Sequence, residues 1–318
     1  MFIVSFMLDS AEIIAHRPPK NSLDSERPYH FLHEQETNAD GDLQAVNTIF
    51  LTNNECPFKC IMCDLWKNTL DQPTPVKAIP HQIKYALNRL PEASVIKLYN
   101  SGNFFDAKAI PPDDYPNIAK LLNEYERVIV ENHPKLCGPR CVEFRDLLDG
   151  SLEIAMGLET IHPDVLPKLN KQITKQNFAE AADYLCSNNI DMRAFILLNP
   201  PYLLGRDENM YWTLESVKFA FDCGATACSI IPTRLGNGMM EKLQADGQYI
   251  PPTLDALEEV FSEALALNRG RIFVDLWDLK QFSSCENCFE DRKKRLQSMN
   301  FRQEILPAIN CHCEGAHE

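Results

Sequence analysis

Short apolar runs alternate along this chain with stretches in which apolar residues recur every three or four positions. The apolar runs predict strands, because each is short and bounded by turn-forming residues. We predict strands over residues 46–52, 95–100, 127–131, 152–157, 192–198 and 227–232. The amphipathic stretches predict helices near 80–90, 116–125, 141–149, 176–188, 213–222 and 253–268. Strands that are apolar almost throughout and alternate with helices indicate an α/β fold with a parallel sheet covered by helices.

The two ends of the chain differ from this alternating centre. Residues 9–45 are polar and rich in proline and charge, and they predict an extended lead-in that wraps the domain or stays mobile. We therefore expect an N-terminal extension over 1–45, a core over 46–270 and a cysteine-rich extension over 271–318. The first eight residues are apolar but lack a basic leading region, so they predict an ordered edge or a tail and no signal peptide.

Composition is that of a soluble, cytoplasmic protein. Hydrophobic residues make up 45% of the 318 positions, which is ample for a core, and no run of about 18 apolar residues predicts a membrane span. Twelve cysteines without a secretion signal indicate reduced thiols that bind metal or do redox work.

The net charge of −14 disfavours nucleic acid as a partner, because nucleic-acid binders usually carry a basic face. Small molecules or peptides are the expected substrates. The one dense basic run, residues 292–295, predicts the solvated side of a helix.

Three cysteines follow the first predicted strand in a C-x3-C-x2-C pattern. Cys56, Cys60 and Cys63 lie in one short loop, where three thiolates can hold three irons of a 4Fe-4S cube and leave the fourth open. The alternatives are a structural zinc knuckle, which normally needs a fourth nearby ligand, or cysteines buried as small apolar residues.

This spacing resembles the signature of the radical S-adenosylmethionine (radical SAM) superfamily. The resemblance implies a partial (β/α)6 barrel resembling a TIM barrel, a 4Fe-4S cluster on the three cysteines, and SAM chelating the open iron. It also implies an electron donor such as flavodoxin or ferredoxin. The residue before the third cysteine packs against adenine in that family, and Met62 occupies this place.

Active sites of parallel barrels gather at the carboxyl ends of the strands. After the second strand, Ser101, Gly102 and Asn103 stand where relatives bind the methionine amino group; an ordinary turn is the alternative. After the fourth strand, Glu159 matches the position whose polar side chain contacts the SAM ribose, and a helix cap is the rival explanation.

The remaining strands add further candidates. Arg193 needs an anionic partner, which the SAM carboxylate, an acidic substrate or a structural ion pair would supply. Thr233 begins a loop whose backbone reaches the adenine in relatives. His133, Cys137 and Cys141 follow the third strand, where they face SAM or substrate, or are simply packed.

The carboxyl-terminal segment contains two cysteine pairs. Cys285 and Cys288 are separated by a basic segment from Cys311 and Cys313, and four thiols in two pairs predict a second metal site, either zinc or 4Fe-4S.

At the level of the branch, the motifs look like archaeosine synthase and, more distantly, the Elongator catalytic subunit. The resemblance thus predicts an enzyme that cleaves SAM reductively to a 5'-deoxyadenosyl radical and abstracts hydrogen from a small molecule or peptide. Two alternatives stay open: a tRNA-modifying radical SAM enzyme, and a non-catalytic scaffold or sensor stabilised by metal.

Overall fold

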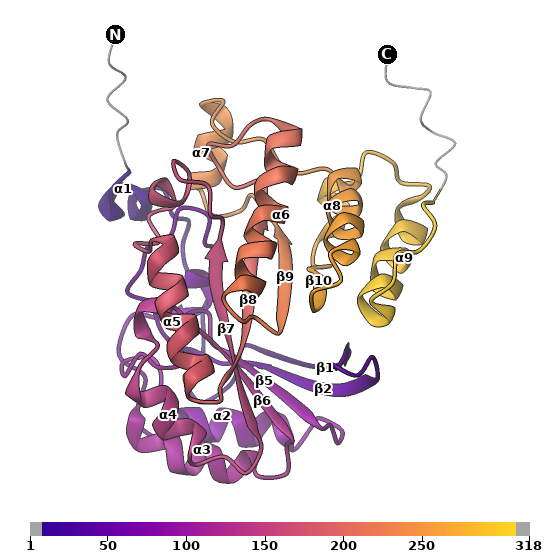
Figure 1. Cartoon of the computed structure of the whole chain (residues 1–318). Helices are drawn as coiled ribbons and strands as arrows, with labels where there is room; N and C mark the ends of the chain where they lie inside the picture. Colours follow the sequence, from indigo (N-terminus) through magenta and orange to yellow (C-terminus); the bar gives the residue numbers. More distant parts are fainter. Residues whose placement is uncertain (1–7, 310–318) are drawn as a thin grey trace.

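The structure is a computed structural model that describes residues 8–309 (Figure 1). Its centre is one sheet with the strand order β1-β2-β5-β6-β7-β8-β9-β10. The strands are β1 His30–Thr37, β2 Leu43–Phe50, β5 Val95–Tyr99, β6 Arg127–Asn132, β7 Ser151–Glu159, β8 Asp191–Leu198, β9 Ala227–Pro232 and β10 Arg271–Val274. Strand β1 runs antiparallel to β2, and every other pairing in this sheet is parallel. A two-stranded parallel sheet of β3 Asn53–Asn54 and β4 Thr69–Leu70 follows β2.

Helices cover the convex face of the sheet. They are α2 Ala78–Leu87, α3 Tyr115–Leu122, α4 Pro139–Arg145, α5 Lys175–Ser187, α6 Arg206–Asp222 and α8 Leu254–Ala266. In Figure 1, α2, α3 and α4 lie together in the lower part, and α5, α6 and α8 stand beside the later strands. Alternate side chains of the strands, such as Ile96, Leu98, Ile154 and Ile196, pack with these helices into one large core.

Further helices complete the chain. Helix α1 Ser10–Ala15 precedes β1, α7 Met239–Ala245 follows β9, and α9 Phe289–Arg302 follows β10. The short 3-10 helices are η1 Leu65–Asn68, η2 Pro112–Asp114, η3 Pro134–Leu136, η4 Leu166–Leu169 and η5 Leu279–Phe282. None of the helices in residues 8–309 is both long and apolar enough to cross a membrane.

The opposite face of the curled sheet carries charged side chains near the amino ends of the strands. Arg193 donates to Glu36 across the barrel at 2.9 and 2.5 Å and to Glu153 at 2.7 Å. Lys97 pairs with Glu36 at 2.7 Å, and Arg271 of β10 donates to the Thr37 carbonyl of β1 at 3.2 Å. The sheet is thus a half-barrel. Its edge strands β1 and β10 are linked by side-chain hydrogen bonds and ion pairs and not by a ladder of backbone hydrogen bonds.

The parallel α/β architecture predicted from the sequence is confirmed, with strand ends shifted by a few residues. The expected boundaries at 45 and 270 fall inside β2 and just before β10, because β1, β2 and β10 all belong to the sheet. Residues 9–29 do form a lead-in that includes α1.

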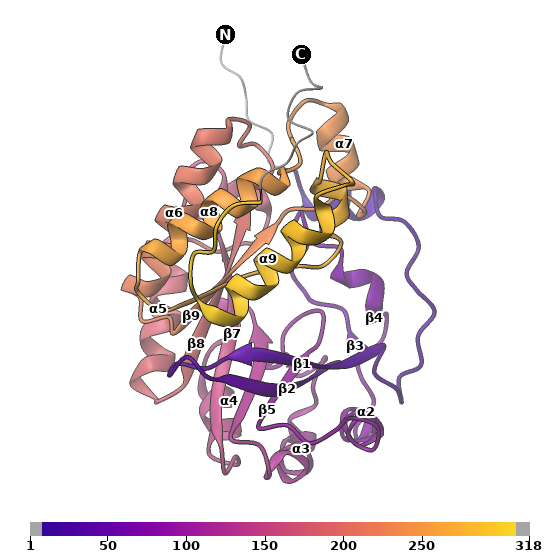
Figure 2. The ribbon, with the colours of Figure 1, turned by 90° about the vertical axis from the view of Figure 1, so that its right-hand side faces the viewer.

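The expectation of a solvated face for the basic run holds for only half of it. Lys293 and Lys294 are exposed, but Arg292 and Arg295 are buried. Arg292 pairs with Asp255 and Glu258 of α8, which places α9 beside α8 (Figure 2). Positions three or four residues apart on this helix are therefore buried in packing contacts.

Candidate active site

The cysteine loop lies at the carboxyl edge of the sheet, where side-chain amides of neighbouring loops donate hydrogen bonds to its backbone carbonyls. Asn170, from the loop after β7, donates to the Lys59 carbonyl at 2.8 Å. Asn237, from the loop after β9, donates to the Ile61 carbonyl at 2.7 Å and the Cys63 carbonyl at 3.1 Å. Because these loops are distant in sequence, the loop conformation is set by the whole barrel mouth.

Burial dominates the chemistry of the three thiols. It raises the pKa of Cys60 to about 12, and it also raises the pKa values of Cys56 and Cys63. The charges of neighbouring thiolates raise the pKa values of Cys60 and Cys63 further, which shows that the three groups are close together. None of the three forms a disulfide. Cys60 is buried and Cys56 and Cys63 are partly buried, and thiols whose pKa values are raised stay protonated at neutral pH unless a cationic group binds them, so this donor set fits a metal cluster.

Within residues 8–309, no three His, Cys, Asp or Glu side chains converge as ligands of one metal ion. In a 4Fe-4S cube each thiolate binds a different iron, so the sulfurs do not need to meet at one point.

The turn after β5 lies directly against the cysteine loop. Asn103 donates through Nδ2 to the Cys56 sulfur at 3.0 Å, and it accepts the His133 backbone N–H at 2.7 Å. A Cβ on Gly102 would lie 3.4 Å from the Cys56 Cβ, so glycine allows this close approach. The structure therefore brings Gly102 and Asn103 against Cys56, and Ser101 precedes them in the same turn.

Glu131 supports this turn from the end of β6. Its Oε1 accepts the backbone N–H groups of Asn100 at 2.5 Å and Gly102 at 3.3 Å. Burial raises the pKa of Glu131, the hydrogen bonds oppose that rise in part, and the net result is a pKa of about 7. Tyr29 contacts the same turn through Ser101 Oγ at 2.9 Å. These contacts of Glu131 and Tyr29 could not be predicted from the sequence, since their partners are backbone atoms or residues far away in the chain.

Glu159 sits in a buried ion pair with Lys171. The two side chains, each about a tenth exposed, lie 2.6 Å apart. A Cβ on Gly157 would overlap both charged groups, and the register of β7 shifts between Gly157 and Glu159. The Lys171 charge lowers the pKa values of Cys56 and Cys60, against the larger effect of burial. Lys171 is thus a buried cation beside the thiols that the sequence analysis missed.

His133 closes this side of the loop. Its ring stacks on Phe58 of the cysteine loop with centroids 3.6 Å apart and planes 11° apart. Its Nε2 lies 2.9 Å from the Lys171 carbonyl. Burial and the Lys171 charge lower the pKa of His133 to about 3, so the imidazole is neutral at physiological pH.

The thiols that follow His133 are packed. Cys141 is fully buried in the main core, and the Cys137 sulfur lies 3.4 Å from the Met156 sulfur. The packed alternative therefore describes these two cysteines.

Two structural features of this edge fit a bound polar ligand such as SAM. Both side-chain atoms of the Asn100 amide are buried without a hydrogen-bond partner among the described residues, and such groups are rare unless a ligand or water completes them. Three residues at strand ends, Ser101, Glu159 and Asn199, have positive φ values of 52°, 67° and 55°. Strained backbone of this kind clusters at ligand sites.

The other predicted site residues are placed as follows. Arg193 lies near the amino end of β8 in the ion pairs with Glu36 and Glu153, so the structural ion pair is the alternative that the structure shows. Thr233 donates through Oγ1 to the Leu198 carbonyl at 2.9 Å at the mouth. Met62 is half-buried in apolar clusters beside the cysteine loop.

The second metal site predicted near the C-terminus finds no support. Cys285 and Cys288 precede α9, with Cys288 as its N-cap residue. Cys311 and Cys313 lie outside the described residues.

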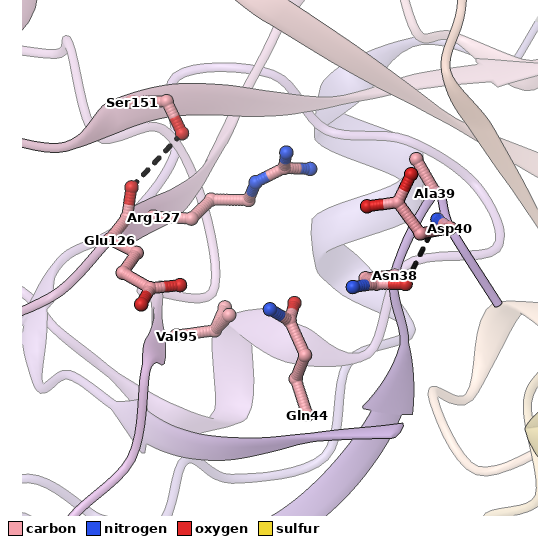
Figure 3. Close-up of a pocket in the computed structure, with 8 residues that line it drawn as sticks. All are labelled: Asn38, Ala39, Asp40, Gln44, Val95, Glu126, Arg127 and Ser151. Atoms are coloured by element: carbon pink, nitrogen blue, oxygen red, sulfur yellow. Dashed lines mark hydrogen bonds between the residues drawn. The ribbon is translucent and has the colours of Figure 1, made fainter. Parts of the chain in front are cut away.

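A small pocket of about 160 Å³ lies at the amino ends of the strands, away from the cysteines (Figure 3). Arg127, Glu126 and Gln44 line it, and Arg127 is also paired with Glu153 at 3.0 Å. This volume is below the roughly 300–1,000 Å³ of typical small-molecule sites, so we do not assign the active site there.

Sequence comparison finds relatives that match most of this chain. The chain is 24% identical over 291 residues to the uncharacterised protein MJ0550 of Methanocaldococcus jannaschii, covering 84% of this chain and 80% of that protein. It is 27% identical over 274 residues to archaeosine synthase subunit beta of Methanosarcina acetivorans, covering 80% of this chain and 78% of that protein. No family model matches the chain.

Among solved structures, SuiB of Streptococcus suis superposes with a TM-score of 0.51 at 11% identity, over 72% of this chain and 48% of SuiB. The chain therefore spans about half of that protein. The Escherichia coli coproporphyrinogen III oxidase HemN, described as a radical SAM enzyme, superposes with a TM-score of 0.48 at 11% identity, over 70% of this chain and 52% of HemN.

The chain thus shares its half-barrel fold with SuiB, and it carries three cysteines in one loop after β2. The fold that the sequence predicts is confirmed at this level.

Proposed function

We propose that this chain is a radical SAM enzyme whose Cys56, Cys60 and Cys63 hold a 4Fe-4S cluster. When bound, the cluster and SAM supply reductive cleavage of SAM to methionine and a 5'-deoxyadenosyl radical, which abstracts hydrogen from the substrate. The observation that carries the proposal is the contact between the cysteine loop and the turn after β5, through Asn103 and Gly102. This contact supports the proposal because the turn that would bind the ligand lies directly against Cys56, one of the three thiols.

The chain's own residues would position SAM. The backbone carbonyls of Ser101 and Gly102, in the turn that Glu131 holds, would accept hydrogen bonds from the methionine amino group. The Asn100 side-chain amide, which has no partner among the described residues, is available to a polar group of the ligand. Glu159 keeps an oxygen that Lys171 does not use, and we propose that it accepts hydrogen bonds from the ribose hydroxyls.

The sequence suggested Arg193 as a cation that could face the SAM carboxylate, and we propose Lys171 for this role instead. Arg193 is saturated by two glutamates near the amino end of its strand, whereas Lys171 is a buried cation whose charge acts on Cys56 and Cys60. We propose that Lys171 faces the SAM carboxylate. Met62 and Thr233 remain the proposed neighbours of the adenine.

A small molecule or a peptide is the proposed substrate. One solved structure of the neighbour SuiB is bound to a precursor peptide, which supports a peptide as a candidate substrate. A tRNA substrate is the second candidate, because two relatives bear the name archaeosine synthase subunit beta. Salt-sensitive binding of tRNA to the purified protein would favour the second candidate over the first.

The test is anaerobic reconstitution with iron and sulfide, followed by SAM and dithionite. We expect release of 5'-deoxyadenosine, loss of this activity in Cys60→Ala, and retention in Cys186→Ala, which removes an exposed thiol far along the chain. A fully iron-loaded protein that neither binds nor cleaves SAM would instead support the structural scaffold or sensor.

A further inference from the structure

A groove between α2 and α3 concentrates positive charge on an acidic protein. Lys77, His81, Lys84 and Lys120 line this groove, whose volume is about 430 Å³. Pro80 and Leu121 contribute apolar surface to it. We refer to these six residues as the lysine groove.

The three lysines have no ion-pair partner within residues 8–309, while His81 lies 2.7 Å from Glu26. All three are exposed. The chain as a whole carries a net charge of −14, so most of its surface repels an anionic partner. Glu26 pairs with His81 and the Asp114 carboxylate accepts the Lys77 backbone N–H, so the three lysine ammonium groups are the part of this cluster that attracts such a partner and selects where it docks.

The lysine groove is mechanically connected to the cysteine loop. On the inner side of α2, Gln82 exchanges two hydrogen bonds of 2.8 Å with the backbone of Thr52, which lies just before the loop. Thr74, three residues before Lys77, accepts the Asn54 N–H at 2.9 Å. Cys56 lies two residues after Asn54 and Lys77 lies three residues after Thr74, so the Cα atoms of Lys77 and Cys56 lie within about 25 Å of each other. Figure 2 shows α2 next to β3 and β4, which flank the cysteine loop.

The proposed function requires an electron from outside, and this inference rests on that function. We infer that the lysine groove is the docking site of an acidic one-electron carrier protein of the flavodoxin type. In each transfer the carrier is oxidised by one electron, and the cluster held by the three thiolates is reduced by one.

The groove suits such a carrier better than RNA. Transient redox complexes use small interfaces at the low end of the size range, and three lysines around an apolar floor match this. RNA affinity comes from many phosphate contacts, and the lining contains no arginine and no large aromatic ring for base stacking. The groove also lies outside the sheet, so a docked carrier leaves the barrel mouth open to SAM and substrate.

The test compares the triple variant Lys77→Glu, Lys84→Glu, Lys120→Glu with a control of equal charge change, Lys175→Glu, Lys293→Glu, Lys294→Glu, whose lysines are also exposed. Binding of a strongly acidic flavodoxin is measured by calorimetry at low and high salt, and 5'-deoxyadenosine formation is measured with reduced flavodoxin and with dithionite.

We expect the groove variant to weaken flavodoxin binding and raise its KM by about tenfold or more at low salt. Dithionite-driven activity should match that of the wild type, and the control should stay within about twofold of it. Equal effects in both variants, unchanged flavodoxin binding, or loss of tRNA binding alone would overturn the inference. If the wild type cleaves no SAM with dithionite, the proposed function fails, and the binding measurement still decides the docking site.

Discussion

Replacing Lys171 with Met tests the role of the buried ion pair most sharply. Lys171 and Glu159 lie 2.6 Å apart with side chains only 10% and 9% exposed, so removing the lysine leaves a carboxylate buried without its counter-charge. Breaking a buried pair from one side costs about 3–5 kcal/mol. We expect the free energy of unfolding of the metal-free protein to fall by this amount.

The double variant Lys171→Met, Glu159→Gln supplies the control. It removes both charges, so its loss of stability should be smaller than that of Lys171→Met alone by at least about 2 kcal/mol. Urea denaturation followed by circular dichroism measures each variant under reducing conditions.

The same substitution should also slow cluster assembly. Because the Lys171 charge lowers the pKa values of Cys56 and Cys60, its loss raises both and reduces the thiolate fraction available to iron. The assigned pairing would be refuted if Lys171→Met were as stable as the wild type. It would also be refuted if the double variant lost as much free energy of unfolding as Lys171→Met and Glu159→Gln lose together when measured separately.

Three further substitutions probe the surroundings of the loop. Gly157→Ala should destabilise the protein by about 1–3 kcal/mol, since its methyl group overlaps the ends of the Glu159 and Lys171 side chains, which must shift, and an unchanged urea midpoint would contradict this. Asn103→Ala should raise the pKa of Cys56 by removing a donor to its sulfur, so alkylation of that thiol, followed by peptide mass spectrometry across pH, should shift to higher pH. Hydrogen bonds from basic side chains outweigh burial and lower the Glu55 pKa to about 2. Glu55→Gln should therefore remove stability that is present above about pH 4.5 and that fades as the pH falls towards 2. A stability advantage of the wild type over Glu55→Gln that does not shrink in acid would exclude this.

The cysteine loop and the strand-helix alternation could be predicted because they are local patterns. Apolar runs identify β5 to β9, and C-x3-C-x2-C places three thiols in one loop whatever the rest of the chain does. Ser101, Gly102 and Asn103 are predicted from the family resemblance, at a strand end where the rule for parallel strands expects ligands to gather.

The remaining parts depend on long-range contacts. Strand β1 reads as a polar lead-in because Glu34 and Glu36 face the charged barrel interior, where Lys97 and Arg193 neutralise them. Lys171 lies in a loop, and only the fold brings it to Glu159 and the thiols.

Arg193 shows the limit of reasoning from one strand. The sequence indicates that this arginine needs an anion, but not that Glu36 and Glu153 provide it from other strands near the amino end. Depth along the barrel decides between a ligand site and a structural pair, and depth follows from the register of the strands.

The most direct test of the central claim is Mössbauer spectroscopy of the reconstituted protein before and after addition of SAM. A cube held by Cys56, Cys60 and Cys63 has one iron without a protein ligand, so we predict that the signal of one of the four irons changes when SAM binds. Four irons whose signals are indifferent to saturating SAM would contradict the account.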